Sequence, residues 1–380
     1  MKKMVIIVTV PVVLETWLKG QPKFLSDYYN VEIITAYAPS ITKIQSHENV
    51  TIKTMDFTRE INPLKDIKVL LQLFVYLVRT RPSIVYTLTP KAGLLGMIAS
   101  WMALISHRVH NIVGLPHLEA KGRRRIILTY TEKITYFFAS NLYCNSKNLR
   151  TIVATMTNKT VKVIGDGSVN GVDTALFRDT MQDDEKSKVK EALRFLEDDF
   201  IITYVGRIVK DKGLNELLDV FDDLSKKHSH IKLLLIGDYK NETDPISRES
   251  QIIMQSNKHI KYLEFQDDVK AFLSITNLFV LPSYREGLPN VLIEAGSLGI
   301  PMVATDINGC NEVVEDGVNG ILVKPKDKVL LFEAIERFVV DKVFYMHIKN
   351  AVRPSIIKKY EQHRFWKSLK EMFFELEKEK

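Results

Sequence analysis

Two glutamates, Glu286 and Glu294, stand eight positions apart in the segment PSYREGLPNVLIEA at residues 282–295. The apolar run at residues 275–281 predicts a buried strand before this segment, and residues 291–295 predict the first turn of a helix. Amide groups at a helix N-terminus lack partners within the helix and favour anions. Two carboxylates beside such a site can bind hydroxyl groups of a sugar or a ribose. The segment therefore suggests a sugar-nucleotide site.

Two cations lie on another predicted strand-to-helix connection, YVGRIVKDKG at residues 204–213. Gly206 permits a tight turn there. Arg207 suits bidentate contacts with phosphate, and Lys212 acts as a point charge. Alone, the segment is typical of a charged surface loop, but beside the glutamates it indicates a clamp for a diphosphate. The glutamates are then better interpreted as hydroxyl-binding groups than as an acid–base pair.

Short apolar runs alternate with helical patterns along both halves of the chain. This alternation predicts two doubly wound α/β domains, each with a parallel sheet. The predicted strands are residues 4–10, 31–35, 51–55, 84–87, 108–112, 141–144, 200–205, 231–236, 260–263, 278–281, 302–305 and 320–323. The predicted helices are residues 17–29, 64–80, 93–105, 123–139, 213–228, 249–256, 269–274, 291–298 and 328–340.

The domain boundary is predicted at residues 165–178, a segment rich in Gly, Ser, Asn and Asp. We expect an N-terminal domain at 1–178, a second domain at 179–355 and a C-terminal amphipathic segment at 356–380. Apolar residues recur at helical spacing in the last segment, which indicates one long helix or two helices with a bend.

The net charge of +7 is divided unevenly, with +12 on residues 1–178 and −5 on residues 179–380. The basic half suggests an anionic partner: a membrane surface, a lipid that carries a pyrophosphate, or nucleic acid. No RNA-binding motif is recognisable, which argues against nucleic acid. The densest basic cluster is Lys121–Arg125, before the amphipathic run 126–138, and it predicts peripheral binding to an anionic membrane.

The cysteines and the N-terminal residues bear on the cellular compartment. Cys144 and Cys310 fit no metal or disulfide pattern, which favours a reduced cytosolic compartment. The apolar run Met4–Val10 is better explained as a first strand than as a signal peptide. No apolar stretch reaches the ~18–20 residues that a transmembrane helix needs. We expect a cytoplasmic protein at the inner face of the cell membrane.

Three motifs together resemble the family 4 retaining glycosyltransferases of the GT-B fold: GRIVKDKG, PSYREGLPNVLIEA and GIPMVATDINGCNEVVEDGVNGILV. The likeness is strongest over residues 200–340. In the first half, TLTPKAGLLGMIAS, NIVGLPH and GSVNGVD resemble the subgroup that builds bacterial capsule, O-antigen and lipid-linked oligosaccharides. The resemblance implies two Rossmann-like domains that face a cleft, and a C-terminal helix that returns to the first domain.

The resemblance places the donor in the second domain. Arg207 and Lys212 would bind its diphosphate, Glu294 would hold the ribose hydroxyls, and Glu286 would contact the sugar or lie beside its reacting face. The base would lie just after the strand at 260–263. The implied donor site consists of Arg207, Lys212, Glu264, Phe265, Glu286, Gly287, Leu288, Pro289, Asn290 and Glu294.

The first domain is expected to bind the acceptor. His110 and His117 flank NIVGLP, near the end of a strand where relatives often place a catalytic or sugar-contacting residue, and His117 is the first choice. The other candidates are Lys91, at a predicted helix start, and Thr9 and Thr16, in the first loop. The predicted catalytic residues are His117, Glu286, Arg207 and Lys212.

These assignments predict transfer of a hexose or N-acetylhexosamine from a nucleotide sugar, most simply a UDP-sugar, to a polyprenyl-diphosphate-linked saccharide. The Asp-Asp pairs fall in predicted helices or turns and do not form Asp-x-Asp, so we expect no metal and no cofactor. Alternatives are a soluble or protein acceptor and a non-catalytic nucleotide-sugar binder. A dinucleotide oxidoreductase would need a Gly-x-Gly-x-x-Gly turn, which both strand-to-helix turns lack.

Overall fold

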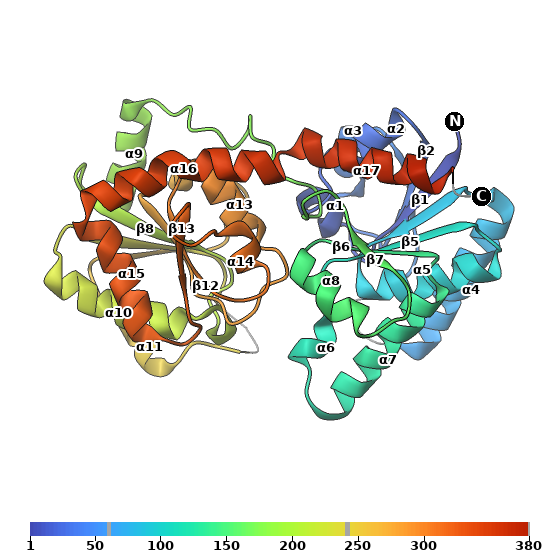
Figure 1. The fold of residues 1–380 in the computed structure, drawn as a ribbon, viewed down its shortest axis with the longest axis horizontal. Helices are drawn as coiled ribbons and strands as arrows, with labels where there is room; N and C mark the ends of the chain where they lie inside the picture. Colours follow the sequence, from blue (N-terminus) through green and yellow to red (C-terminus); the bar gives the residue numbers. More distant parts are fainter. Residues whose placement is uncertain (59–61, 240–243, 379–380) are drawn as a thin grey trace. The chain divides into compact units, whose positions relative to one another are not determined.

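A computed structural model describes residues 1–58, 62–239 and 244–378 (Figure 1). The chain forms two compact units. One contains Met1–Gly171 together with Gln362–Lys380, and the other contains Val172–Glu361. The first boundary lies inside the expected seam at 165–178. The second lies beyond residue 355, because the helix there continues through Pro354 as far as Tyr360.

The first unit is built on a seven-stranded parallel sheet with the strand order β3-β2-β1-β4-β5-β6-β7. Its strands are β1 (Lys3–Ile7), β2 (Asn30–Thr35), β3 (Thr51–Thr54), β4 (Ile84–Thr87), β5 (His107–Ile112), β6 (Asn141–Cys144) and β7 (Val161–Val163). Its helices are α1 (Val12–Thr16), α2 (Gln21–Ser26), α3 (Ile41–Glu48), α4 (Pro63–Thr80), α5 (Pro90–Met102), α6 (Pro116–Glu119), α7 (Gly122–Phe138), α8 (Lys147–Ala154) and α17 (Gln362–Leu376).

Helices cover both faces of this sheet, since successive residues of β1 belong to different cores. Met4 and Ile6 pack in a core with residues of α2 and α17. Val5 and Ile7 pack in another core with residues of α4, α5 and α7. The strand is buried on both sides, as expected for a parallel sheet with crossover helices.

The predicted helix at 17–29 is wrong in its extent. Helix α1 ends at Thr16, and α2 begins only at Gln21. Gly20 lies between them with φ of 80°, a left-handed conformation that glycine adopts without strain. The predicted segment therefore contains only the short helix α2, and α1 lies before it.

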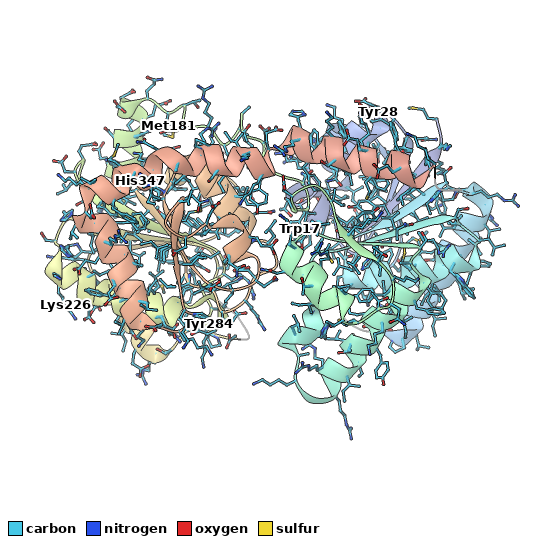
Figure 2. The ribbon with its side chains drawn as sticks, in the orientation of Figure 1. Trp17, Tyr28, Met181, Lys226, Tyr284 and His347 are labelled. Carbon is cyan, nitrogen blue, oxygen red and sulfur yellow. The ribbon has the colours of Figure 1, made fainter. Side chains whose placement is uncertain are left out.

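The C-terminal segment contains two helices, and the second one returns to the first unit. Phe365, Leu369 and Phe373 of α17 are buried in the core beside α2. The Trp366 ring stacks on Phe24 with 5.1 Å between centroids, and its indole N–H donates to Asn170 Oδ1 at 2.7 Å. Tyr28, labelled in Figure 2, follows α2, and its ring lies 5.8 Å from that of Phe374 near the end of α17. The expected return of the C-terminal helix to the first domain is confirmed.

The second unit is built on a six-stranded parallel sheet with the order β10-β9-β8-β11-β12-β13. Its strands are β8 (Phe200–Val205), β9 (Ile231–Ile236), β10 (Ile260–Leu263), β11 (Leu278–Leu281), β12 (Met302–Thr305) and β13 (Gly320–Val323). Its helices are α9 (Asp183–Leu193), the 3₁₀ turn η1 (Lys210–Lys212), α10 (Leu214–Lys227), α11 (Arg248–Ser256), α12 (Lys270–Ser274), α13 (Asn290–Ser297), α14 (Cys310–Val313), α15 (Lys328–Val340) and α16 (Lys342–Tyr360).

Both units are therefore doubly wound α/β folds, as predicted. The strand order reverses between β1 and β4 in the first sheet and between β8 and β11 in the second. Ligands of such sheets bind at the carboxyl ends of the strands at this switch point. In the described ranges, no helix is both long and apolar enough to span a bilayer.

Candidate functional site

The loops after β8 and β11 meet at the switch point of the second sheet. Residues 206–213 follow β8, and residues 282–289 follow β11. Gly213 has φ of 71°, and a Cβ at this position would lie 2.0 Å from the Pro282 carbonyl oxygen. Because only glycine permits this approach, the two loops pack backbone against backbone. Four of the predicted donor residues, namely Arg207, Lys212, Glu286 and Gly287, lie on this pair of loops.

Lys212 and Glu286 form a salt bridge at this edge. The Lys212 ammonium donates to Glu286 Oε1 at 2.6 Å, and the Ser283 hydroxyl donates to the same oxygen at 2.7 Å. The two charged side chains are only 19% and 14% exposed, so much of their hydration has been replaced by these contacts. The predicted diphosphate-binding cation and the predicted sugar-binding carboxylate are thus in direct contact.

Further contacts fix the geometry of the loop that carries Glu286. The Arg285 guanidinium donates to Asp211 Oδ2 at 2.6 Å, which links this loop to η1. The hydroxyl of Tyr284, labelled in Figure 2, lies 2.7 Å from both carboxylate oxygens of Glu216 on α10. The first pair joins the two loops, and the second joins the β11 loop to α10. Together they restrain the position of Glu286.

Arg207 lies at the start of the β8 loop with an exposed side chain. Its carbonyl oxygen accepts a hydrogen bond from the buried Tyr204 hydroxyl at 2.8 Å, which fixes the backbone. The charged end of Arg207 is therefore accessible to a ligand on the same loop as Lys212.

Helix α13 begins at the same edge. Its first residue is Asn290, and Pro289 precedes it as the N-cap, so the first-turn amides point toward the end of the sheet. Gly309 of the next loop has φ of 83°, and a Cβ there would lie 1.8 Å from the Gly287 carbonyl oxygen. Leu288 packs against the core beside them. The predicted segment 287–290 is thus held in a fixed arrangement in front of the helix.

Glu294 lies on α13, one turn beyond its first residue. Burial raises the pKa of its carboxyl group to about 7. Because the cause is desolvation, a ligand hydroxyl that donates to this carboxylate would stabilise the charged form. Glu294 is the carboxylate of the pair that is sensitive to pH near neutrality.

Glu264 and Phe265 directly follow β10, at the edge of the sheet and two strands from β8. The side chain of Phe265 is 64% exposed. An exposed aromatic ring at the carboxyl edge is available to stack on a base. Base binding by this segment stays a prediction.

The corresponding edge of the first sheet carries buried hydroxyl groups. The Thr9 and Thr89 hydroxyls lie 2.7 Å apart, and the Thr9 amide donates to Thr89 Oγ1 at 3.0 Å. The Ala92 amide of α5 also donates to Thr9 Oγ1, at 3.3 Å. Thr9 therefore joins the ends of β1 and β4 to the start of α5. Thr16, by contrast, is exposed, and its hydroxyl donates to Val12 O within α1.

His110 lies in the core. Its Nδ1 is 2.8 Å from the Thr87 hydroxyl, and a Cβ at Gly93 would lie 2.4 Å from its ring. Burial lowers the pKa of His110 to about 4, so the imidazole is neutral near pH 7. This predicted acceptor residue therefore lies beneath α5, where it packs against Gly93 and bonds Thr87.

His117 lies in α6 and is only 5% exposed. Its Nδ1 is buried and has no hydrogen-bond partner among the described residues. Burial, and the positive charge of Arg125, lower the pKa of His117. Lys91 is the other charged candidate, and its ammonium pairs with Asp66 Oδ1 of α4 at 2.9 Å.

Comparison with known proteins identifies the family. The family model described as "Glycosyl transferases group 1" matches residues 185–354. The capsular polysaccharide biosynthesis glycosyltransferase CapM of Staphylococcus aureus is 30% identical over 361 residues, which cover 94% of this chain and 93% of CapM. The chain belongs to the group 1 glycosyltransferases.

Other glycosyltransferases share the sequence or the fold. An Escherichia coli enzyme, UDP-Gal:alpha-D-GlcNAc-diphosphoundecaprenol alpha-1,3-galactosyltransferase, is 29% identical over 77% of this chain and 75% of its own. The crystal structure of Anabaena HepE in complex with UDP-glucose superposes with a TM-score of 0.81 at 18% identity, covering 99% of this chain and all of HepE. The expected membership of family 4 and the GT-B fold are confirmed.

Several residues around the Lys212–Glu286 pair of this glycosyltransferase were not predicted. Ser283 is fully buried and bonds Glu286, while the Thr305 hydroxyl donates to the Ser283 carbonyl oxygen. Asn308 donates to the Glu286 carbonyl oxygen at 3.3 Å. Ser283 lies within the same motif as Glu286, and this proximity in sequence could have indicated its role. No local signal linked Thr305 or Asn308 to that loop, because their proximity depends on β11 pairing with β12.

The described residues include no group of three or more His, Cys, Asp or Glu side chains arranged to hold a metal ion. Cys310 is buried beside the Lys212–Glu286 pair, and this burial raises the pKa of its thiol.

Proposed function

We propose that this glycosyltransferase moves a hexose or N-acetylhexosamine, with retention of configuration, from a UDP-sugar to a polyprenyl-diphosphate-linked saccharide. The product would be a bacterial surface polysaccharide or its lipid-linked precursor. The names of the S. aureus and E. coli relatives support this substrate class. The observation that carries the donor assignment is the Lys212–Glu286 pair at the switch point of the second sheet.

In the proposed reaction, the bond between the anomeric carbon and the diphosphate oxygen breaks, and a bond to an acceptor oxygen forms. Negative charge grows on the leaving UDP, and positive charge grows on the sugar ring. Arg207, Lys212 and the amides at the start of α13 supply the positive charge that the diphosphate needs, so the proposal requires no metal. The acceptor hydroxyl passes its proton to the diphosphate oxygen that leaves the anomeric carbon, so the products are the glycosylated acceptor and UDP.

The two glutamates would bind hydroxyls. Glu294, whose pKa is raised to about 7, becomes a stronger acceptor when ribose hydroxyls donate to it and favour its charged form. Glu286 would exchange part of its contact with Lys212 for a contact with the donor sugar, because the diphosphate attracts the same ammonium. Ser283 would keep Glu286 oriented during this exchange.

On the acceptor side, Lys91 and His117 would contact the acceptor, and Thr9 would hold the start of α5 in position. His117 offers a neutral imidazole with an unpartnered ring nitrogen, which suits a contact with a sugar hydroxyl. Lys91 would attract the acceptor diphosphate, and Asp66 holds its ammonium in place until then. The charge of +12 on residues 1–178 supports an anionic acceptor and a membrane surface as partners.

A panel of nucleotide sugars tests the donor assignment. We expect UDP and at least one UDP-sugar to raise the melting temperature, since a ligand at 100 times its Kd adds ~2.7 kcal/mol of stability. UDP release should then depend on added polyprenyl-diphosphate sugar. No stabilisation by UDP or any UDP-sugar would overturn the donor assignment, and equal turnover with a soluble sugar would overturn the acceptor assignment.

A further inference from the structure

Helix α4 carries a stripe of exposed apolar residues along its outer side. Val69, Leu73 and Leu77 face the core of the first unit, as an amphipathic helix requires. A second set repeats at intervals of three and four residues on the solvent side, with exposures of 42–83%. This set consists of Leu64, Ile67, Leu71, Val75 and Val78.

The neighbouring helices extend this apolar surface. Helix α5 packs between α4 and α7, and all three contribute to one core on the same face of the sheet. Trp101 of α5 is 50% exposed and lies 5.0 Å from the Phe138 ring of α7. Helix α7 has its own exposed apolar stripe, made of Ile126, Ile127, Tyr130, Ile134 and Phe137. Monomeric proteins rarely expose so many contiguous apolar side chains without a partner.

Cations border both stripes and outnumber the acidic groups near them, of which Asp56 pairs with Lys68 at 2.8 Å. Helix α4 exposes three cations, namely Lys65, Lys68 and Arg79. Helix α7 exposes Arg123, Arg124, Arg125 and Lys133. The acidic residues of these three helices are Asp66, which pairs with Lys91, and Glu132, which is buried. The surface therefore combines apolar side chains with positive charge.

This surface adjoins the acceptor edge of the first unit. Helix α4 follows β3 and α7 follows β5, so both helices begin on the carboxyl side of the sheet. The salt bridge from Lys91 to Asp66 joins the start of α5 to the first turn of α4 directly. A ligand at Lys91 would thus lie near the first turn of α4, where the apolar stripe begins.

We propose that the outer sides of α4, α5 and α7, the α4–α7 surface, dock this enzyme on an anionic lipid bilayer. The apolar stripes would enter the interfacial layer, and the flanking cations would contact anionic headgroups. This inference rests on the proposed function, because a polyprenyl acceptor remains in the bilayer. A second copy of the chain fits less well. A two-fold contact would bring two copies of the same positively charged surface together.

Flotation with vesicles tests the docking without any substrate. Vesicles of phosphatidylglycerol and phosphatidylcholine should bind the wild-type chain at physiological salt, and pure phosphatidylcholine should bind at least tenfold less. The triple variant Leu64→Gln, Ile67→Gln, Leu71→Gln should reduce binding at least tenfold. The matched control Val329→Gln, Val340→Gln, Val343→Gln removes equally exposed apolar residues of the second unit and should bind as the wild type does.

Tryptophan emission gives a second readout that a folding defect would not imitate. Anionic vesicles should shift the emission to the blue, Trp101→Phe should abolish the shift, and Trp17→Phe should preserve it. All variants should keep the melting-temperature rise with UDP, so a failed donor assignment and a failed docking surface are distinguishable. The proposal is overturned if the α4 triple variant floats as well as the wild type. It is also overturned if that variant converts a dimer to a monomer and still binds vesicles.

Discussion

The two sheets share a topology, but their switch points present different chemistry. The second sheet carries the largely buried Lys212–Glu286 pair, with Arg207 on the same loop as Lys212. The first sheet carries the buried Thr9–Thr89 hydroxyl pair. The charged edge suits an anion such as a diphosphate. The neutral edge holds backbone and hydroxyl groups in fixed positions. Because the two edges differ in charge on the same fold, the fold alone does not determine what each edge binds.

Solvation explains how each edge is stable before a ligand arrives. A partly buried charge without a partner is costly, and Lys212 avoids that cost by pairing with Glu286. A diphosphate can replace Glu286 as the partner of Lys212, so binding exchanges one ion pair for another. The hydroxyls of Thr9 and Thr89 are already satisfied by each other, and they need no ligand.

The largest effect should come from Lys212→Ala. It removes the cation that is proposed to face the leaving diphosphate, while the Ser283 hydroxyl still donates to Glu286. Turnover should fall more than ~10-fold with the fold intact. The matched control is Lys210→Ala, an exposed cation of the same 3₁₀ turn, measured in the same UDP-release assay. Equal losses in both variants would remove the special role of Lys212.

Glu294→Gln should weaken UDP binding by about tenfold at pH 8, where the carboxylate is charged and accepts ribose hydroxyls. Because the folded pKa is raised to about 7 from an ordinary 4.5, the folded chain binds more protons than the unfolded chain between these values. Stability should therefore fall as pH rises from about 4.5 to about 7, by on the order of 3 kcal/mol at most.

Denaturation at several pH values checks this sign. The wild type should lose stability across that window, and Glu294→Gln should show a flatter profile there. Parallel profiles for the two proteins would mean that burial does not shift the Glu294 pKa, and unchanged UDP affinity would exclude the ribose contact.

His117→Ala should act on the other edge only. The expected result is a roughly fivefold loss in kcat/KM for the acceptor, because one neutral hydrogen bond is lost. The UDP-induced rise in melting temperature should stay as in the wild type. A loss of UDP affinity instead would show that the two edges are not chemically separate.

The smallest effect is expected from Thr9→Val, which keeps the side-chain shape and removes one hydroxyl. The Thr89 hydroxyl and the Ala92 amide lose a partner, so unfolding free energy should fall by about 1–2 kcal/mol. Denaturant unfolding measures this change. Large loss of turnover with unchanged stability would instead indicate a direct contact between Thr9 and the acceptor.

The sequence predicted the sheets well, because parallel strands read as continuous apolar runs. Residues 200–205 and 278–281 were placed with the same bounds that β8 and β11 have. The sequence also singled out Lys212 and Glu286. It could not predict their direct pairing, since the two residues are 74 positions apart and meet only through the adjacency of β8 and β11.

Other features depended on tertiary contacts that no local pattern encodes. The short strand β7 escaped prediction because three residues carry too little pattern. The sequence placed a boundary between residues 355 and 356, yet α16 continues across it from Lys342 to Tyr360. Helix α4 was predicted, but the exposure of its second apolar stripe follows from where α5 packs.

We propose that the charged edge of the second sheet recognises a diphosphate through Lys212. Calorimetric titration of UDP and of UMP into the wild type and into Lys212→Ala tests this recognition. The wild type should prefer UDP over UMP by at least about tenfold, since one charge-assisted contact contributes ~1.5–3 kcal/mol, and the variant should lose this preference. The same UDP-to-UMP preference in both proteins would contradict it.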